Sequence, residues 1–567
     1  MKKTAILLAL MCLTTVAFAK SSKTVTIRLI ETSDVHGAFF PYNFTERRPM
    51  QGTMARVSTY LKRQRQQYGK NVILLDNGDI LQGQPTCYFT NFVATDRPNI
   101  AAEVINYMQF DAETFGNHDV EPGHAVYDKW IKEVKCPMLG ANIIDTKTGK
   151  PYVKPYTIIQ REGVRIAILG MLTPAIPNWL HESLWTGLRF EEMIGYARKY
   201  IKILKEKEKA DIIVGLFHSG WDGGIVTPDY EEDVAKKMAE VVEGFDVIFF
   251  GHDHTERSTT VNGVTCLDPS CNAVKVAQAT ITIRDGKVID KKGEIVDITG
   301  EAIDEDFMNH FKTQIESVRQ YVERQIGTFT APMSSRDAFF GSAPFVDYIH
   351  ELQLEETHAD VSFTAPLTFD SEIKAGPVYM SDMFKLYRYE NKIYTLRMTG
   401  EEIRRHLELS YDLWVNTMKS ADDHIMLLTD HAWNDKQRMG FKNMTFNFDS
   451  AAGIDYVVDV TKPDGQKVHI LQFSDGSPFD EKAWYTVAMS SYRGNGGGEL
   501  LTQGAGIPLE EIPGRIIYKS DFDQRHYLTK KIEREGTVNP KALGNWRFIP
   551  DAWARPALER DRKLIFK

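Results

Sequence analysis

Five short polar segments in the first half of the chain carry residue types that bind metal ions. They are Asp34-Val-His36, Gly78-Asp79, Gly116-Asn117-His118, His218 and Gly251-His252-Asp-His254. Imidazole nitrogens suit transition metals, whereas carboxylate and amide oxygens suit harder ions. A mixed set of this kind indicates Zn, Mn, Fe or Mg. Ions of this kind can activate a water molecule for hydrolysis.

Each polar segment follows an apolar run that predicts a buried β-strand. The runs that precede the polar segments are 25–30, 72–75, 112–115, 212–217 and 247–250, and one further run lies at 164–169. Helical patterns lie between the runs, at 54–66, 99–108, 190–207 and 233–242. Alternation of strand and helix is typical of α/β folds with mostly parallel strands. Ligands of such sheets bind at the carboxyl ends of the strands. We therefore expect the five segments to meet at one edge of a sheet.

The order of these segments resembles the calcineurin-like metallophosphoesterase superfamily over most of residues 24–260. The shared pattern is D-x-H, G-D, G-N-H-[D/E], H and G-H-x-H. The resemblance implies an α/β/β/α sandwich with a two-metal site. One ion would be held by Asp34, His36 and His254, the other by Asn117, His218 and His252, and Asp79 would bridge the two ions.

His118 is the candidate for protonating the leaving group, since histidine titrates near neutral pH and can be tuned by a carboxylate. In the nucleotidase branch of the superfamily the motif is Gly-Asn-His-Glu-x-Asp, and the final Asp orients the histidine. This chain has Glu121 at that position, with one more methylene of reach. Asp119 is either a catalytic acid or a support for the loop, and the alternative for His118 is simple packing in the turn.

The carboxy-terminal half carries a second resemblance, to the 5′-nucleotidase carboxy-terminal domain, over most of residues 335–520. The matching segments are 339–342, 359–366, 382–391, 398–401 and the glycine-rich 492–498. The resemblance implies an α+β domain that binds the nucleoside and reorients against the metal-binding domain.

Aromatic faces that stack on a nucleobase are needed in such a domain. Phe448, shortly before Ala452-Gly453, matches one family position, and Tyr492 is the candidate for the other. Asn495, Gly496 and Gly497 of the adjoining loop are further candidates for substrate contact. The alternatives are core packing for the two aromatic residues and an ordinary tight turn for the loop.

The lack of an arginine in one segment narrows the range of expected substrates. Classical 5′-nucleotidases carry an arginine-bearing segment where this chain has 362–370, which contains no arginine. The guanidinium of such an arginine would bind a phosphate through two parallel N–H donors. Its loss favours the 2′,3′-cyclic-nucleotide 2′-phosphodiesterase/3′-nucleotidase branch over a standard 5′-nucleotidase. Two alternatives stay open: hydrolysis of non-nucleotide phosphate esters or nucleotide sugars, and a catalytically degenerate surface binding protein, although all seven ligand positions are filled.

The chain has 567 residues and a net charge of −9, which offers no field to attract nucleic-acid polymers. A basic start, a short apolar run and Ala17-Phe18-Ala19 predict a secretory signal peptide over 1–19 rather than a membrane anchor. We therefore expect a periplasmic or secreted protein. The remaining chain divides into a catalytic domain at 20–300, a linker helix at 301–330 that ends at Gly327, and a substrate-binding domain at 331–567.

Cys266 and Cys271 flank a turn-like Leu-Asp-Pro-Ser segment. An oxidising compartment would permit a disulfide between them. Two free thiols are the alternative.

Overall fold

The strand that precedes Asp34 and His36 lies in the middle of a six-stranded sheet. This computed structural model describes residues 24–432 and 439–567. The order of the sheet is β19 (Lys287–Asp297), β18 (Lys275–Arg284), β1 (Thr24–Thr32), β4 (Val72–Asp76), β5 (Ala112–Thr114) and β6 (Met138–Leu139). Strands β1, β4, β5 and β6 run parallel, whereas β18 pairs antiparallel with both β1 and β19. The predicted signal peptide lies outside the described residues.

A second six-stranded sheet packs face to face against the first. Its order is β16 (Arg257–Val261), β17 (Val264–Asp268), β15 (Val247–Phe250), β12 (Ile212–His218), β10 (Val164–Leu172) and β9 (Tyr156–Arg161). Strands β10, β12, β15 and β17 are parallel. The predicted polar segments therefore end strands of two sheets and meet where the carboxyl edges of these sheets adjoin.

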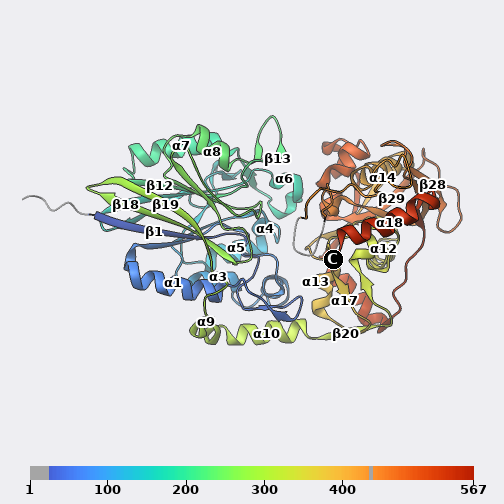
Figure 1. Ribbon diagram of the computed structural model, residues 1–567, viewed down its shortest axis with the longest axis horizontal. Helices are drawn as coiled ribbons and strands as arrows, with labels where there is room; N and C mark the ends of the chain where they lie inside the picture. Colours follow the sequence, from blue (N-terminus) through green and yellow to red (C-terminus); the bar gives the residue numbers. More distant parts are fainter. Residues whose placement is uncertain (1–23, 433–438) are drawn as a thin grey trace, which may run out of the picture.

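Helices cover the outer face of each sheet, as Figure 1 shows, so that the predicted sandwich is present. Helices α1 (Met54–Tyr68), α3 (Ile100–Met108) and α5 (His124–Glu133) lie on the first sheet, and α7 (Met193–Glu206) and α8 (Ala235–Val241) on the second. Successive side chains of a strand point to opposite faces of the sheet, so each strand contributes to two cores. In β4, Leu74 faces the helices, whereas Ile73 and Leu75 pack with Val214 and Leu216 between the two sheets.

The connection between the halves differs from the single helix predicted over 301–330. It contains α9 (Glu305–His310) and α10 (Lys312–Val322), separated by Phe311, whose ψ of 11° is not helical. Gly327 lies in strand β20 (Gln325–Phe329) instead of ending a helix. The apolar positions nevertheless face one side, because Phe307, Phe311 and Val318 are buried against the first helical layer.

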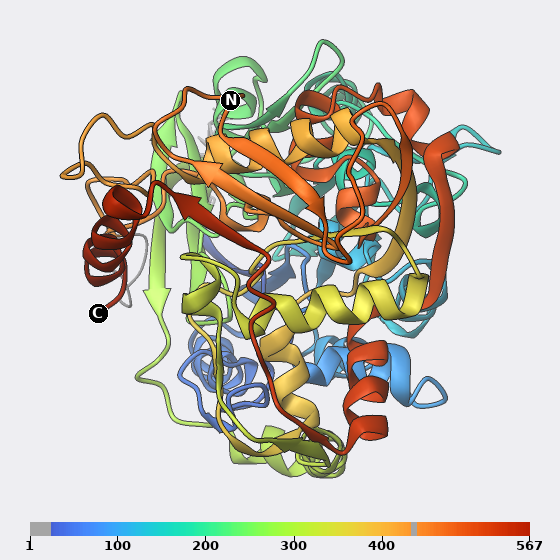
Figure 2. The same ribbon diagram turned by 90° about the vertical axis from the view of Figure 1, so that its right-hand side faces the viewer.

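The carboxy-terminal half is α+β, as predicted. Its five-stranded sheet has the order β26 (Ser450–Ala452), β22 (Val361–Thr364), β29 (Trp484–Ser490), β25 (Lys392–Thr399) and β30 (Ile516–Asp523). Helices α12 (Pro344–Thr357), α14 (Gly400–Trp414), α17 (Gln524–Glu535) and α18 (Asp551–Ile565) pack around it. Figure 2 shows these elements in front of the catalytic domain. Within the described ranges, no helix combines the length and apolar content needed to cross a membrane.

Candidate dinuclear metal site and substrate cavity

The first predicted metal group is assembled from three loops that are far apart in the sequence. Asp34 and His36 follow β1, Asp79 follows β4 and His254 follows β15. Their ligand atoms all lie within 4.8 Å of one another. Nε2 of His254 is 3.1 Å from Nε2 of His36 and 3.2 Å from Oδ1 of Asp34. The structure thus brings together the three side chains expected to hold the first ion and the carboxylate expected to bridge the two ions.

The second predicted group adjoins the first through Asp79. Oδ1 of Asn117 lies 3.1 Å from Nε2 of His218 and 2.8 Å from Nδ1 of His252. Oδ2 of Asp79 lies 3.3 Å from Nε2 of His218 and 3.9 Å from Nε2 of His36. One carboxylate oxygen therefore sits between a histidine of each group, which is the geometry that a bridging ligand requires.

Backbone carbonyls fix the orientation of two of these histidines. Nδ1 of His36 lies 3.2 Å from the carbonyl oxygen of Gln82, and Nδ1 of His218 lies 2.7 Å from that of Asn77. A carbonyl can only accept, so each Nδ1 carries the proton and each Nε2 presents its lone pair to the centre. Burial also lowers the pKa of His36 to about 3, which keeps its imidazole neutral.

The backbone at the ligand positions is unusual. Asp34, His36, Asp79, His252 and His254 all adopt positive φ, between 48° and 79°. This left-handed region costs a residue with a Cβ of the order of 1–3 kcal/mol, and it persists only where the surrounding structure imposes it. Gly78, at φ 85°, has no room for a side chain, because a Cβ would lie 2.2 Å from the backbone nitrogen of Gly116.

These residues fit a pair of divalent ions. Oδ1 of the fully buried Asp34 makes no hydrogen bond although Nε2 of His254 lies 3.2 Å away, and it belongs to a group of ligand atoms that all lie within 4.8 Å of one another. Without cations, Asp79 and Asp34 outweigh the effect of burial and raise the pKa of His218 to about 10. A divalent ion would replace that proton, because metal ligation requires neutral imidazole.

His118 and Glu121 form the pair predicted for leaving-group protonation. Nδ1 of His118 lies 2.6 Å from Oε2 of Glu121, so the longer acid does reach the ring. The backbone N–H of His118 donates to Oδ1 of Asp79 at 2.8 Å, which ties the pair to the metal ligands. Burial lowers the pKa of His118, but Asp79 and Glu121 outweigh it and raise the pKa to about 9. The contact with Glu121 therefore favours the protonated imidazole that a general acid requires.

Asp119 supports the loop instead of facing the cavity, the second of the two roles left open by the sequence. Its buried carboxylate accepts four backbone N–H groups, from Asp79, Ile80, Leu81 and Gly116, at 2.7–2.9 Å. No oxygen is left to act on a substrate. Asp119 therefore orients the turn that presents Asp79.

Glu232 is a contact of the metal site that the sequence reasoning missed. It lies in strand β14 (Glu231–Asp233), and its Oε1 is 2.9 Å from Nε2 of His252. The other ring nitrogen of His252 faces Asn117. Glu232 therefore fixes the tautomer in which Nδ1 of His252 is the ligand atom. A lone Glu in a polar insertion gives no sequence signal for this role.

Replacing Glu232 with alanine should weaken the second ion selectively. Loss of such an orienting carboxylate typically costs about 10- to 100-fold in metal affinity. We expect metal analysis after dialysis to find about half the metal content of the unmodified protein. Glu231→Ala, one residue away and directed to Lys237, is the matched control and should keep full metal content. Equal loss in both variants would contradict the role of Glu232.

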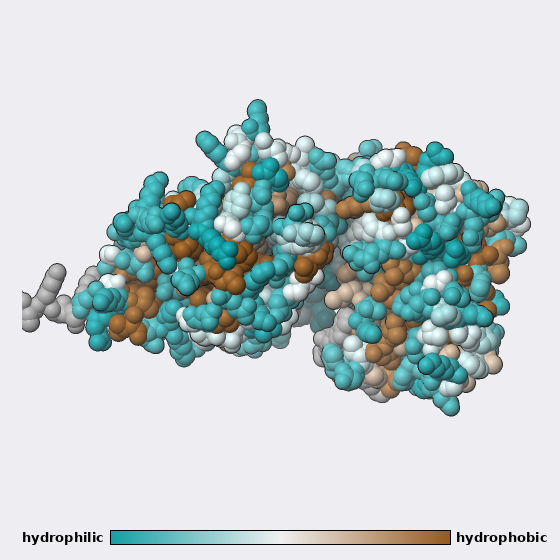
Figure 3. Space-filling model, turned by 90° about the horizontal axis from the view of Figure 1, so that it is seen from above, coloured by the Kyte–Doolittle hydropathy of each residue, from teal (hydrophilic) through white to brown (hydrophobic). Residues whose placement is uncertain are grey.

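A cavity of about 640 Å³ lies between the two halves of the molecule. One wall carries Asn117, His118, His252 and His254, and the opposite wall carries residues of the carboxy-terminal domain. The space-filling view shows a recess between the two lobes on the face that it presents (Figure 3). A small molecule bound here would contact both domains.

The predicted stacking residue Phe448 does not line this cavity. Its side chain is 0% exposed, and its ring stacks on Trp414 at 5.2 Å within the hydrophobic core. Phe446, two residues earlier, and Tyr492 line the cavity instead, with ring centroids 6.0 Å apart at 87°. The correction follows from the 3₁₀ turn Thr445–Asn447, which turns Phe446 outward before Phe448 enters the core.

The glycine-rich loop supports Tyr492 more than it contacts the cavity. A Cβ at Gly497 would lie 2.6 Å from the ring of Tyr492, so only glycine allows that ring to pack there. Gly496 provides the left-handed turn, at φ 96°. Asn495 lines a neighbouring cavity and not the one beside the metal ligands.

The segment without arginine contributes an apolar wall, through Phe363, Ala365 and Leu367. Arg493 also borders the cavity, but its guanidinium is engaged. It donates to Asp449 at 2.8 and 3.2 Å and to the carbonyl oxygen of Phe446 at 2.8 Å. Arg493 therefore holds the aromatic wall in place.

Cys266 and Cys271 are free thiols in this structure. Cys266 is buried in β17, and the thiol of Cys271 accepts a hydrogen bond from Asn272 at 2.9 Å. The disulfide alternative is not formed here.

Comparison with known families agrees with the geometry. Residues 27–256 match the calcineurin-like phosphoesterase family, and residues 325–503 match the 5′-nucleotidase carboxy-terminal domain. The chain combines a calcineurin-like phosphoesterase domain with a 5′-nucleotidase carboxy-terminal domain. Both resemblances predicted from the sequence are confirmed, and with them the two-domain α/β architecture.

Several characterised proteins are similar to this phosphoesterase along most of its length. A 2′,3′-cyclic-nucleotide 2′-phosphodiesterase/3′-nucleotidase of Haemophilus influenzae is 27% identical, over 94% of this chain and 89% of its own. One of the same name from Salmonella typhimurium is 25% identical, over 95% and 91%. A Staphylococcus aureus protein crystallised as a candidate 5′-nucleotidase has a TM-score of 0.78 at 21% identity, with 92% and 99% covered. At that identity the likeness concerns the fold.

Proposed function

We propose that this phosphoesterase hydrolyses phosphate esters of nucleotides, with 2′,3′-cyclic nucleotides and 3′-nucleotides as its preferred substrates. The observation that carries the proposal is the single cavity that joins the metal-ligand wall to Phe446 and Tyr492. Its volume of about 640 Å³ is in the range of small-ligand sites. The arginine-free segment and the names of the relatives described above support the cyclic-nucleotide branch.

Two divalent ions, held by the seven ligand residues described above, would supply Lewis acidity toward the attacking water and the phosphoryl oxygens. The chain provides the remaining functions. Asp79 fixes the spacing of the two groups, and the backbone turns hold the ligands before substrate arrives. His118, oriented by Glu121, donates a proton to the leaving oxygen of the nucleoside.

Phe446 and Tyr492 would hold the nucleobase against the carboxy-terminal wall. Stacking on an aromatic ring contributes about 1–3 kcal/mol per base. We further propose that the protein acts outside the cytoplasm, on the basis of the basic start, apolar run and Ala17-Phe18-Ala19 site at its amino terminus. This compartment would give it access to extracellular or periplasmic nucleotides.

A substrate panel tests the proposal. Purified protein loaded with Mn or Zn is assayed for phosphate release from 2′,3′-cyclic, 3′- and 5′-nucleotides and from p-nitrophenyl phosphate. The highest kcat/KM is expected for the cyclic and 3′-nucleotides. Preference for 5′-nucleotides would reassign the branch, and absence of turnover on every ester would favour a degenerate binding protein.

Replacing Phe446 with alanine should raise KM for nucleotides by about 5- to 100-fold, the equivalent of one lost stacking contact. KM for p-nitrophenyl phosphate should stay unchanged, because this small ester does not reach the base wall. Phe448→Leu is the matched control: it perturbs the core and should lower thermal stability without a selective change in nucleotide KM. A similar rise in KM for both esters with Phe446→Ala would exclude stacking by that ring.

A further inference from the structure

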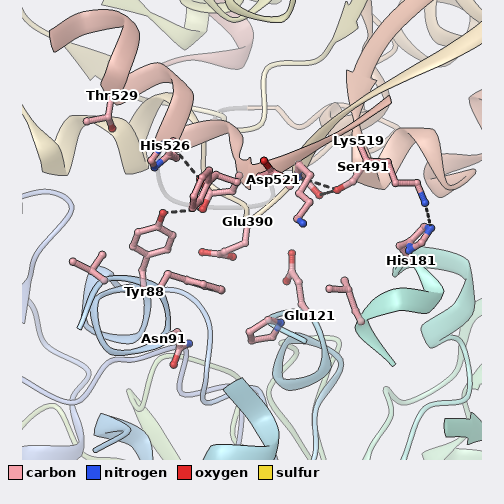
Figure 4. Close-up of a pocket in the computed structure, with 18 of the residues that line it drawn as sticks. Tyr88, Asn91, Glu121, His181, Glu390, Ser491, Lys519, Asp521, His526 and Thr529 are labelled. Atoms are coloured by element: carbon pink, nitrogen blue, oxygen red, sulfur yellow. Dashed lines mark hydrogen bonds between the residues drawn. The ribbon is translucent and has the colours of Figure 1, made fainter. Parts of the chain in front are cut away.

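A second cavity, of about 610 Å³, adjoins the substrate cavity between the two domains. Glu121, Trp179, Leu180 and Asn391 line both spaces, so the two are neighbours on either side of the His118–Glu121 pair. Residues of both domains line the second cavity, and Figure 4 shows His181 and Lys519 facing each other at one end. Nothing in the proposed reaction uses this space.

Three basic side chains gather at that end of the cavity. His181 belongs to the catalytic domain, whereas Lys392 in β25 and Lys519 in β30 belong to the carboxy-terminal domain. Tyr394 lies beneath them, with its ring centroid 5.1 Å from Nζ of Lys519 and 5.8 Å from the ring of His181. Among the residues that the structure describes, neither lysine has a carboxylate within ion-pair distance.

His181 and Lys519 are in direct contact across the boundary between the domains. Nδ1 of His181 accepts the backbone N–H of Ser183 at 3.0 Å and lies 2.7 Å from the hydroxyl of that residue, while Nε2 contacts Nζ of Lys519. Burial, and then Lys392, lower the pKa of Lys519. A charged Nζ has three N–H donors, so an acceptor beside this contact would bind those that His181 leaves open.

Carboxylates also lie near this cluster. Glu182 raises the pKa of His181, but burial and the charge of Lys519 outweigh it, and the net shift is downward. Asp521 and Asp523 line the same cavity, and Asp523 accepts a hydrogen bond from Tyr88. Because neither lysine forms an ion pair with these acids among the described residues, their N–H donors suit an anion with several acceptor oxygens.

We propose that His181, Lys392 and Lys519 form an anion subsite that binds a phosphoryl group other than the one hydrolysed. The inference rests on the proposed nucleotidase function for its substrate, although the subsite itself does not. Two sources share this chemistry: a second phosphate on a nucleotide, such as the 5′-phosphate of a nucleoside 3′,5′-bisphosphate, and free inorganic phosphate.

Trp179 and Leu180 connect the subsite to the metal ligands. The Trp179 ring lies 5.6 Å from the ring of His252, Leu180 lines both cavities, and His181 follows directly. A nucleotide that extends from the substrate cavity into the second cavity would therefore pass these residues and bring a second phosphate toward His181.

The test compares a nucleoside 3′,5′-bisphosphate with the matching 3′-monophosphate in the metal-loaded enzyme. We expect KM for the bisphosphate to be lower by about tenfold, the effect of one charge-assisted hydrogen bond. Lys519→Met and His181→Gln, one change in each domain, should remove that difference. Lys287→Met, at the exposed β18–β19 turn, is the matched control and should preserve it.

Calorimetric titration with inorganic phosphate separates the two sources and does not depend on turnover. Two phosphates per chain in the unmodified enzyme and one in Lys519→Met, with equal KM for both nucleotides, would identify free phosphate as the ligand. One phosphate per chain in both proteins, together with equal KM values, would overturn the subsite. If the enzyme cleaved p-nitrophenyl phosphate but no nucleotide, the proposed function would fail, and the titration would still decide the subsite.

Discussion

Replacing Asp79 with asparagine is expected to lower kcat by roughly a thousandfold or more, since several kcal/mol of charge stabilisation depend on the metal pair. Oδ2 of Asp79 lies between His36 and His218, and Oδ1 accepts the N–H of His118. A neutral amide would weaken the link between the two ions while preserving the side chain's shape. Metal analysis should then find one ion or fewer per chain, and kcat should fall on every ester tested.

Asp229→Asn is the matched control for this change, because Asp229 lies exposed in a loop of the same domain. It should keep both ions and full activity. Thermal unfolding of both variants without metal would show whether the fold is retained. An Asp79→Asn enzyme with two tightly held ions and normal kcat would remove the basis of the dinuclear assignment.

His118→Gln should lower kcat for nucleotides by about a hundredfold to ten-thousandfold, the usual contribution of a positioned general acid. The loss should be much smaller for p-nitrophenyl phosphate, because its phenolate leaves readily without a proton. Metal content should remain at two ions, since the side chain of His118 is not among the ligand groups. The comparison of two leaving groups separates proton donation from general damage to the site.

Replacing Glu121 with glutamine tests the same proton donation, and a smaller effect is expected. It keeps a hydrogen-bond partner for Nδ1 of His118 but removes the charge, so we expect a loss of about tenfold, again confined to the nucleotide. Equal losses on both esters for His118→Gln would show that this histidine positions the site and does not donate the proton.

The metal ligands could be predicted from the sequence because each one stands directly after a strong strand pattern. The apolar runs before Asp34, Asp79 and His218 fix where each strand ends, and the loops leave the ligands little freedom. The pairing of the strands could not be predicted from the sequence in the same way. Parallel runs such as 25–30 and 212–217 look alike, so the sequence did not show that they belong to two stacked sheets whose edges meet.

Contacts that depend on irregular segments could not be predicted in the same way. Phe446 and Phe448 have the same residue type two positions apart, and only the 3₁₀ turn decides which one enters the core. Glu232 and His181 lie in polar insertions without periodicity. Phe311 fits an amphipathic helix in the sequence, whereas in the structure its packing against Phe40 and Phe307 coincides with the break between α9 and α10.

The positive φ angles of the ligand turns have a consequence for the engineering of this protein. Glycine would relieve conformational strain at Asp34, His36, Asp79, His252 and His254, but it offers no side-chain ligand. A library selected only for heat resistance should therefore accumulate such replacements and lose turnover. Directed evolution of a more heat-stable enzyme would have to keep these five codons constant and select stabilising replacements elsewhere in the domain.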